Sequence, residues 1–320
     1  MSRPKQDFFW YCLFSVKGLG PKRLHVLQRL LDERSLSPGD LLQLPPAELR
    51  DLLSTELSDT IVEQLQNLPW DELEIEFQGL QETGVQVVHL EHADYPALLH
   101  ERLQDGAPGV LFCLGYLPLL RSDSVAIVGS RSASPRGLEL AEQLAQTLAL
   151  EGKNVISGFA KGVDTQAHLG ALRAEGTTTI VLSSGIFDFV KRSSGDEVDW
   201  ERNALALSQF HPCDHWSARN AMTRNKLVCA FSRAVIVIEA GQERDEDGKM
   251  SGTYQTAKTA LDMGVPLFVI SPRRLPDAPP GNAELIELGG TEFNPDAGLE
   301  PILTPAQSCT PHGQQQSLFG

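Results

Sequence analysis

The chain has 320 residues, of which 41% are hydrophobic and 22% are charged, as in an ordinary globular protein. Its 27 Lys and Arg against 42 Asp and Glu give a formal net charge of −15, which argues against a histone-like coat of positive charge. Nucleic acid is not excluded as a ligand, because binding depends on where the basic side chains lie. The charge is uneven: residues 1–115 hold 9 basic and 18 acidic side chains, residues 116–290 hold 18 and 21, and residues 291–320 hold 3 acidic side chains and no basic ones.

Cysteine usage and hydropathy favour a cytoplasmic protein without a membrane partner. The 5 cysteines include no C-x-x-C pair, which fits a reduced compartment better than a secreted disulfide scaffold. An apolar stretch at 8–16 follows two basic residues, as in a signal peptide, but no small-residue cleavage site comes after it. We interpret it as a first core helix. No apolar run approaches the ~20 residues that a membrane span needs.

Residues 1–80 are predicted to form a small helical domain of the helix-hairpin-helix or SAM-like type. Leu24, Leu27 and Leu31 recur at helical spacing, and Pro45-Pro46 opens a further helix. The segment 18–23, Gly-Leu-Gly-Pro-Lys-Arg, resembles the hairpin of helix-hairpin-helix modules, which hold phosphate with backbone N–H groups. A simple helix-capping turn is the alternative for this segment.

Residues 81–290 are predicted to form a Rossmann-like α/β core with a doubly wound, mostly parallel sheet. Short apolar runs that read as strands alternate with amphipathic helices, and this alternation is typical of parallel sheets. The predicted strands cover 85–90, 110–114, 125–128, 154–157, 178–183, 234–239 and 266–270. The helices between them include one from Pro135, one at about 164–174 and one at 253–263.

Two glycine-rich turns follow successive strands of this core, and each carries a basic residue. Gly129-Ser130-Arg131 follows the strand at 125–128, and Gly158-Phe159-Ala160-Lys161-Gly162 follows the strand at 154–157. In doubly wound sheets ligands bind at the carboxyl ends of the strands, where helix N-termini favour phosphate. Neither G-x-G-x-x-G nor the P-loop pattern is present, so the ligand is expected to carry phosphate without being a standard dinucleotide or P-loop nucleotide.

A third basic element is the segment 219–226, in which Arg219, Arg224 and Lys226 open a helix. Cations are unfavourable at a helix N-terminus unless an anion binds there, so we favour phosphate contact over a merely solvated first turn. Phe159 is a candidate for stacking on a base, and a buried core position is its alternative.

Other side chains are candidates for metal or acid–base chemistry. His211-Pro212-Cys213-Asp214-His215 gathers soft ligands but has no second pair, so no metal is expected. Glu239 suits a cation, a ribose hydroxyl or a structural role, and His168 suits a packed or capping position. No catalytic constellation emerges, and we expect no enzyme activity and no cofactor.

Several segments together resemble the DprA/Smf family of DNA-processing proteins, within the wider SMF/DprA–LOG superfamily. They are 127–131, 157–164 with His168, 224–232, 237–240, 251–253, 94–96 and 108–115. The resemblance implies a Rossmann-like core that binds single-stranded DNA and delivers it to a RecA-type recombinase, as in natural transformation. It also implies DNA contacts at Arg131 and Lys161, and a homodimer.

The residues predicted to bind DNA or phosphate are Gly129, Ser130, Arg131, Gly158, Lys161, Gly162, Arg219, Arg224, Asn225, Lys226, Ser251, Gly252 and Thr253. The chain departs from the family pattern at 187–207, which is shorter and more charged, at the acidic loop 241–250, and in lacking a winged domain after the core. The alternative function is binding of a nucleotide or nucleotide signal in the same crevice, with or without catalysis, in phage defence or a mobile element. Thr256 stands where related nucleotide hydrolases carry a glutamate, which weakens the enzymatic version.

Residues 291–320 are predicted to form a flexible tail, because 301–317 is rich in Pro, Gln and Ser. The tail ends in Gln315-Gln316-Ser317-Leu318-Phe319, which resembles the peptides that bind the bacterial sliding clamp. Leu318 and Phe319 would enter a hydrophobic pocket, and Gln315 would satisfy a polar one. A chance match of five residues is the alternative.

Overall fold

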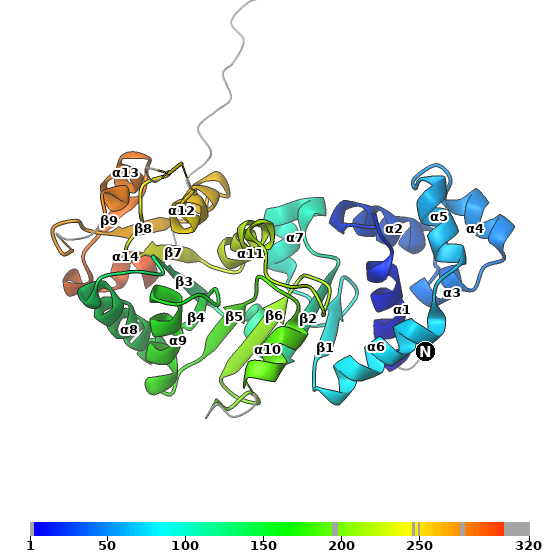
Figure 1. Ribbon diagram of the computed structural model, residues 1–320, viewed down its shortest axis with the longest axis horizontal. Coiled ribbons are helices and arrows are strands. Elements are labelled where there is room, and N and C mark those ends of the chain that lie inside the picture. Colours follow the sequence, from blue (N-terminus) through cyan, green and yellow to red (C-terminus); the bar gives the residue numbers. More distant parts are fainter. Residues whose placement is uncertain (1–2, 194–197, 245–246, 249, 276–278, 304–320) are drawn as a thin grey trace, which may run out of the picture.

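The computed structural model describes residues 3–193, 198–244, 247–248, 250–275 and 279–303. These residues form one nine-stranded sheet in the order β1-β2-β6-β5-β4-β3-β7-β8-β9 (Figure 1). The seven strands β6-β5-β4-β3-β7-β8-β9 each pair in parallel with their neighbours in this series, whereas β2 is antiparallel to both β1 and β6. The predicted α/β class with a mostly parallel sheet is therefore confirmed.

The strands are β1 (Gln86–His89), β2 (Val110–Gly115), β3 (Ser124–Val128), β4 (Asn154–Ser157), β5 (Thr178–Val181), β6 (Ala204–Ser208), β7 (Ala234–Val237), β8 (Leu267–Ile270) and β9 (Thr291–Phe293). Every strand predicted from the sequence is present, with ends that differ by no more than two residues. Two strands were not predicted. One is β6, which lies inside the sheet between β5 and β2, and the other is β9 at its far edge.

The α-helices are α1 (Arg3–Ser15), α2 (Pro21–Arg34), α3 (Pro38–Leu42), α4 (Pro46–Leu53), α5 (Asp59–Gln66), α6 (Trp70–Glu82), α7 (Ala97–Leu103), α8 (Pro135–Leu150), α9 (Val163–Arg173), α10 (Ile186–Ser193), α11 (Ala218–Ala230), α12 (Gly252–Asp262), α13 (Gly281–Glu287) and α14 (Glu300–Leu303). Short 3₁₀ turns lie at η1 (Gln104–Gly106), η2 (Leu117–Arg121) and η3 (Pro295–Ala297). No helix in these described segments is long and apolar enough to cross a membrane.

Successive side chains along each strand point to opposite faces of the sheet, and each face packs into its own hydrophobic core. On one face, α7, α11 and α12 pack on side chains such as Val128 and Val237. On the other face, α8 and α9 cover the β3–β4–β7 half through residues such as Ile127 and Ile236. Because helices cover both faces of the sheet in the described residues, the strand ends and the loops that follow them are accessible to a ligand.

The N-terminal helices α1–α6 form the helical region predicted for residues 1–80, and they lie at one end of the molecule (Figure 1). Their apolar side chains, including Trp10 and Leu31, form one continuous cluster with Phe112 of β2 and Ile180 of β5. These helices and α10 therefore cover the part of the sheet face that α8 and α9 leave open. The N-terminal region shares its hydrophobic core with the sheet.

The predicted start of the tail at residue 291 is wrong. Residues 291–293 form β9, which pairs in parallel with β8, and Leu299 and Ile302 are buried in the core beneath α8. Three residues of strand and one turn of helix are too short to give a recognisable periodicity in the sequence. Gln315, Leu318 and Phe319, the residues predicted to bind the sliding clamp, lie outside the described residues.

Candidate nucleic-acid interface

The two predicted basic turns touch each other at the carboxyl edge of the sheet. Gly129 leaves room for α9, because a Cβ there would lie 2.5 Å from Val163 Cγ2. Gly162 has φ +84° and ψ −127°, and a Cβ on it would lie 2.5 Å from the Ser130 carbonyl oxygen. Only glycine adopts this backbone conformation readily. The glycines at the two turns thus permit a backbone contact that places Arg131 and Lys161, both exposed, on neighbouring loops.

Arg131 lies over an aromatic ring that was not among the predicted site residues. Its guanidinium carbon is 5.8 Å from the ring centroid of Trp216, which is 54% exposed in the loop between β6 and α11. A guanidinium over an indole face is an attractive cation–π pair. A large exposed aromatic residue beside an arginine is the combination that single-strand binders use to stack bases and hold phosphates.

Phe159, in the second turn, is also available for stacking. Its ring is 47% exposed, so the alternative of a buried core residue is wrong. The ring packs edge-on against Phe189 of α10 with centroids 5.1 Å apart, and Phe189 packs in the same way on Trp200. One side of the Phe159 ring therefore packs on Phe189, while part of the ring faces solvent. Phe159 lies two residues before Lys161 in the chain.

A buried polar network lies behind the second turn. His168 donates from Nε2 to the Gly158 carbonyl at 2.7 Å, because a carbonyl can only accept, and its Nδ1 is 2.6 Å from Thr178 Oγ1. Burial lowers the pKa of His168 to about 4, so its ring is neutral near neutral pH. His168 is thus the packed histidine that its sequence position allowed, and it fixes the backbone of the turn.

Arg224 belongs to this network, which makes the prediction of an open phosphate contact wrong for this residue. It is 6% exposed, and its Nη1 is 3.9 Å from the buried Asp164 carboxylate. Burial raises the pKa of Asp164 and lowers that of Arg224, while the attraction between the two charges opposes both effects. The guanidinium lies so close behind Gly158 that a Cβ there would overlap it. Arg224 supports the turn from inside.

The first turn is held by Glu239, for which the sequence allows a cation, a ribose hydroxyl or a structural role. Ser130 N donates to the Glu239 carbonyl at 2.8 Å, and Ser134 N donates to its Oε2 at 2.9 Å. The Ser134 hydroxyl donates to Oε1 and accepts from Gly137 N, which caps the start of α8. Glu239 is 2% exposed, so the structure favours its positioning role.

The third predicted element, α11, presents a basic stripe to solvent. Arg219, Thr223 and Lys226 are exposed at positions i, i+4 and i+7, whereas Arg224 and Leu227 face the sheet. Arg219 lies three residues after Trp216, and Lys226 follows about 10 Å further along the helix axis.

The predicted residues at the start of α12 lie next to α11. Asn225 Nδ2 donates to the Gly252 carbonyl at 3.4 Å. Ser251 caps α12 by accepting from Tyr254 N at 3.3 Å, while Gly252 is exposed and Thr253 is half-buried. These residues border the site, and Ser251 already has a structural role.

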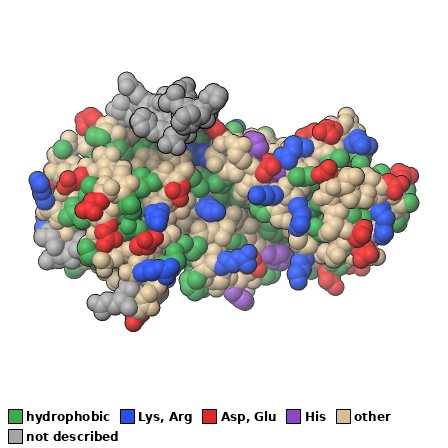
Figure 2. Space-filling view, turned by 90° about the horizontal axis from the view of Figure 1, so that it is seen from above, with side chains coloured by type: hydrophobic (Ala, Val, Ile, Leu, Met, Phe, Trp, Pro, Cys, Tyr) green, Lys and Arg blue, Asp and Glu red, His purple; other side chains and the backbone are tan. Residues whose placement is uncertain are grey.

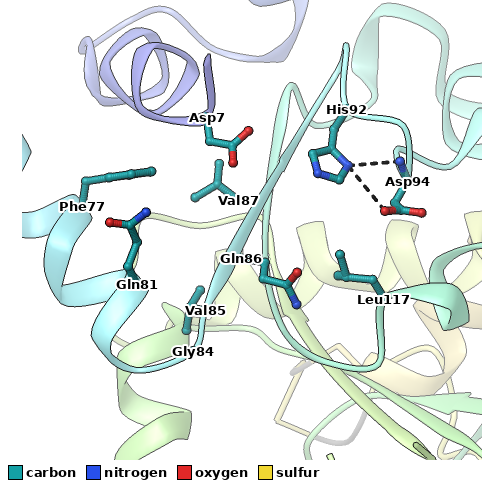
Figure 3. A pocket seen from close by; sticks show the side chains of 10 residues that line it. All are labelled: Asp7, Phe77, Gln81, Gly84, Val85, Gln86, Val87, His92, Asp94 and Leu117. Atoms are coloured by element: carbon teal, nitrogen blue, oxygen red, sulfur yellow. Dashed lines mark hydrogen bonds and ion pairs between the residues drawn. The ribbon is translucent and has the colours of Figure 1, made fainter. Parts of the chain in front are cut away.

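Neither of the two cavities described here contains the basic turns. The first, of about 330 Å³, lies along the edge strand β1 between α1, α6 and the loop with His92 and Asp94 (Figure 3). Among the described residues that line it there are two carboxylates and no lysine or arginine, which is unsuited to phosphate. From above, lysine and arginine side chains are most frequent across the middle of the molecule, and acidic ones towards its ends (Figure 2). Arg131 and Lys161 of the basic turns are themselves exposed to solvent.

Comparison with known proteins gives a consistent relationship. The family model of DNA recombination-mediator protein A matches residues 86–297. DNA processing protein DprA of Streptococcus pneumoniae is 34% identical over 184 residues, or 57% of this chain and 62% of that protein. Protein Smf of Synechocystis sp. is 29% identical over 289 residues, or 86% of this chain and 65% of that protein. The chain thus matches less than two thirds of the length of these relatives.

Two solved structures are similar over most of their length. The X-ray structure of S. pneumoniae DprA superposes with a TM-score of 0.70 and 25% identity, covering 90% of this chain and 94% of that one. DNA processing protein A from Helicobacter pylori, whose structure describes a single-stranded DNA binding mode, gives a TM-score of 0.55 and 29% identity, covering 69% and 97%. Since the family model spans well over half of its residues, this chain belongs to the DprA/Smf family of DNA recombination-mediator proteins.

Proposed function

We propose that this chain binds single-stranded DNA along the carboxyl edge of its sheet. The observation that carries the proposal is the position of the exposed Arg131 over the exposed ring of Trp216. The turn that carries Arg131 is in backbone contact with the turn that carries Lys161. The related H. pylori protein, described with a single-stranded DNA binding mode, supports this assignment.

The arrangement suits a single strand better than a duplex. Arg131, Lys161, Arg219 and Lys226 supply positive charge for phosphates, and Trp216 and Phe159 supply exposed rings for bases. In a duplex the bases are already paired and stacked on one another, so few of them are available to stack on these two rings. The net charge of −15 also repels a broad duplex footprint outside this narrow basic path.

The test is charge reversal at the two turns. Arg131→Glu and Lys161→Glu are expected to abolish binding of a labelled oligothymidylate, measured by fluorescence anisotropy, with unchanged thermal unfolding. Arg202→Glu is the matched control, because Arg202 is an exposed arginine that precedes β6 at the opposite edge of the sheet. Normal binding by both turn variants would remove the site assignment. Tight binding of a mononucleotide without affinity for oligonucleotides would favour the nucleotide-binding alternative.

The fate of the bound strand is the second part of the proposal, and the family resemblance supports it. The chain delivers the strand to a RecA-type recombinase, as in natural transformation, and it acts without catalysis, as a homodimer. Recombinase assembly on single strands precoated with single-strand binding protein should accelerate with the wild-type chain and not with Arg131→Glu. Equal rates with and without the chain would refute delivery, and light scattering gives the oligomeric state.

The sequence of the tail supports one further partner. Gln315, Leu318 and Phe319 would bind the sliding clamp, which would bring the chain to replicating DNA. A peptide of residues 310–320 should bind the clamp, and replacing Leu318 and Phe319 by alanine should abolish this binding. Failure of the peptide to bind at high micromolar concentration would exclude this partner.

A further inference from the structure

A second cavity lies between the N-terminal helices and the loop that follows β6. Its volume is about 470 Å³, within the size range of small-ligand pockets. One wall comes from the end of α1 and the turn 17–21, and the other from residues 209–211 and Asp214. The third wall is 108–110, at the start of β2.

The sheet register places this cavity at the same edge as the proposed DNA site. Phe112 of β2 pairs with Ser208, the last residue of β6, and the two strands are antiparallel. The start of β2 and the residues after Ser208 therefore lie together at the carboxyl edge of the sheet, where Arg131 and Lys161 also lie.

One loop joins the cavity to the stacking surface. Residues 209–211 and Asp214 line the cavity, and Trp216, two residues later, lies under Arg131. Two residues of chain span at most about 7 Å. The loop is fixed from below, because Gly185 N donates to the Asp214 carbonyl at 2.7 Å and has no room for a Cβ beneath the His211 and Pro212 carbonyls.

The lining of the cavity matches a nucleobase. Phe14, Phe210 and His211 contribute aromatic surface, and the His211 ring is nearly parallel to that of Phe14. Gln209 also lines the cavity, and its side-chain nitrogen is shielded from solvent without a hydrogen-bond partner in the described segments. Because this nitrogen has almost no solvent-accessible surface, a base carbonyl would reach it only after the amide turns towards the cavity, and that contact would remove the cost of an unpaired buried donor.

The charged residues around the cavity indicate which part of a nucleotide would enter it, the base or the phosphate. Asp214 also lines the cavity and is exposed, and its negative charge disfavours a phosphate while a carboxylate can accept from a base amino or imino group. Lys17 also lines the cavity, is exposed, and is available to the phosphate of the same nucleotide. We propose that this cavity receives one base of the single strand that crosses Arg131 and Trp216, which extends the DNA path onto the N-terminal helices. This inference rests on the proposed function.

Photocrosslinking tests the inference on the wild-type full chain. An oligothymidylate substituted with 5-iododeoxyuridine is irradiated with the protein, and the modified residues are mapped by mass spectrometry. We expect crosslinks at Phe14, Phe210 or His211 in addition to Trp216. Binding with crosslinks confined to Trp216 and Phe159 would overturn the base cavity and leave the proposed function intact. Absence of DNA binding would overturn both.

A cavity-filling variant gives an independent measurement. Gly20 lines the cavity, and a Cβ there meets no atom within 4 Å, so Gly20→Leu fits the backbone. We expect it to weaken oligothymidylate binding at least fivefold, the lower range for loss of one stacked base. Gly106→Leu is the control, because Gly106 also has open space for a Cβ and does not line the cavity. Equal affinity of the two variants for oligothymidylate would contradict the inference. If Gly20→Leu does not fold, the crosslinks on the wild-type chain decide whether the cavity receives a base.

Discussion

Gly162→Ala is expected to damage both the fold and DNA binding, because Gly162 is the point where the two basic turns touch. Its φ of +84° with ψ −127° is close to inaccessible for alanine, which costs about 1–3 kcal/mol. The new Cβ would also lie 2.5 Å from the Ser130 carbonyl oxygen and 2.8 Å from that of Arg131. Relieving such overpacking costs about 1–3 kcal/mol more. We therefore expect a loss of about 2–6 kcal/mol in the free energy of unfolding.

The matched control is Gly152→Ala, measured by urea unfolding in parallel. Gly152 has φ +68°, and a Cβ there would meet no atom within 4 Å, so its substitution costs only the left-handed conformation, about 1–2 kcal/mol. Gly162→Ala should also weaken single-strand binding at least fivefold where it remains folded, because the carbonyls it displaces belong to the turn of Arg131. Equal destabilisation by the two variants, with unchanged DNA affinity, would refute the claim that the turns are in backbone contact.

Three further substitutions separate binding from support. Trp216→Ala should weaken oligothymidylate binding by about 5- to 150-fold through loss of base stacking, with little effect on urea unfolding because Trp216 is 54% exposed; unchanged affinity would exclude stacking there. Asp164→Asn leaves the Arg224 charge buried without its partner and should cost about 3–5 kcal/mol in urea unfolding; a neutral result would show that Arg224 is stabilised otherwise. For His168, the folded pKa of about 4 lies below the ordinary 6.5, so the unfolded chain takes up the proton first. The contribution of neutral His168 to the free energy of unfolding is complete above pH 6.5 and falls by up to about 3 kcal/mol towards pH 4. His168→Gln should remove this part of the pH dependence of urea unfolding. Identical pH profiles of the variant and the wild type would contradict the burial of a neutral His168.

The alternation of apolar strands and amphipathic helices was sufficient to predict the sheet class and the edge at which the basic turns lie. It missed β6, because Ala204–Ser208 follows a charged segment and has no flanking glycine turn to mark it. The same loss of local signal applies to β9, which is only three residues long and is stabilised by pairing with β8. Short strands of this kind depend on tertiary pairing more than on local pattern.

The sequence predicted part of the geometry of the candidate site, and particular residues show why the rest was missed. Arg131 and Lys161 follow strands directly, so strand order alone places them at one edge. Arg224 was misjudged, although its spacing of three and four from Leu227 and Val228 marks it as facing the sheet. Trp216 gave no signal in the sequence, because only the tertiary fold brings it under Arg131.

The salt dependence of single-strand binding tests the central claim most directly. Of the five basic side chains predicted to contact phosphate at the strand ends, Arg224 is buried and four are exposed, namely Arg131, Lys161, Arg219 and Lys226; the slope below counts these four contacts, without any contact from Lys17. At a slope of about −0.7 per phosphate contact, the wild type should give a log–log slope of about −3. The Arg131→Ala/Lys161→Ala double variant should give about −1.4 with much weaker binding, while Arg202→Ala stays at the wild-type value. An unchanged slope and affinity in the double variant would contradict DNA binding at this edge of the sheet.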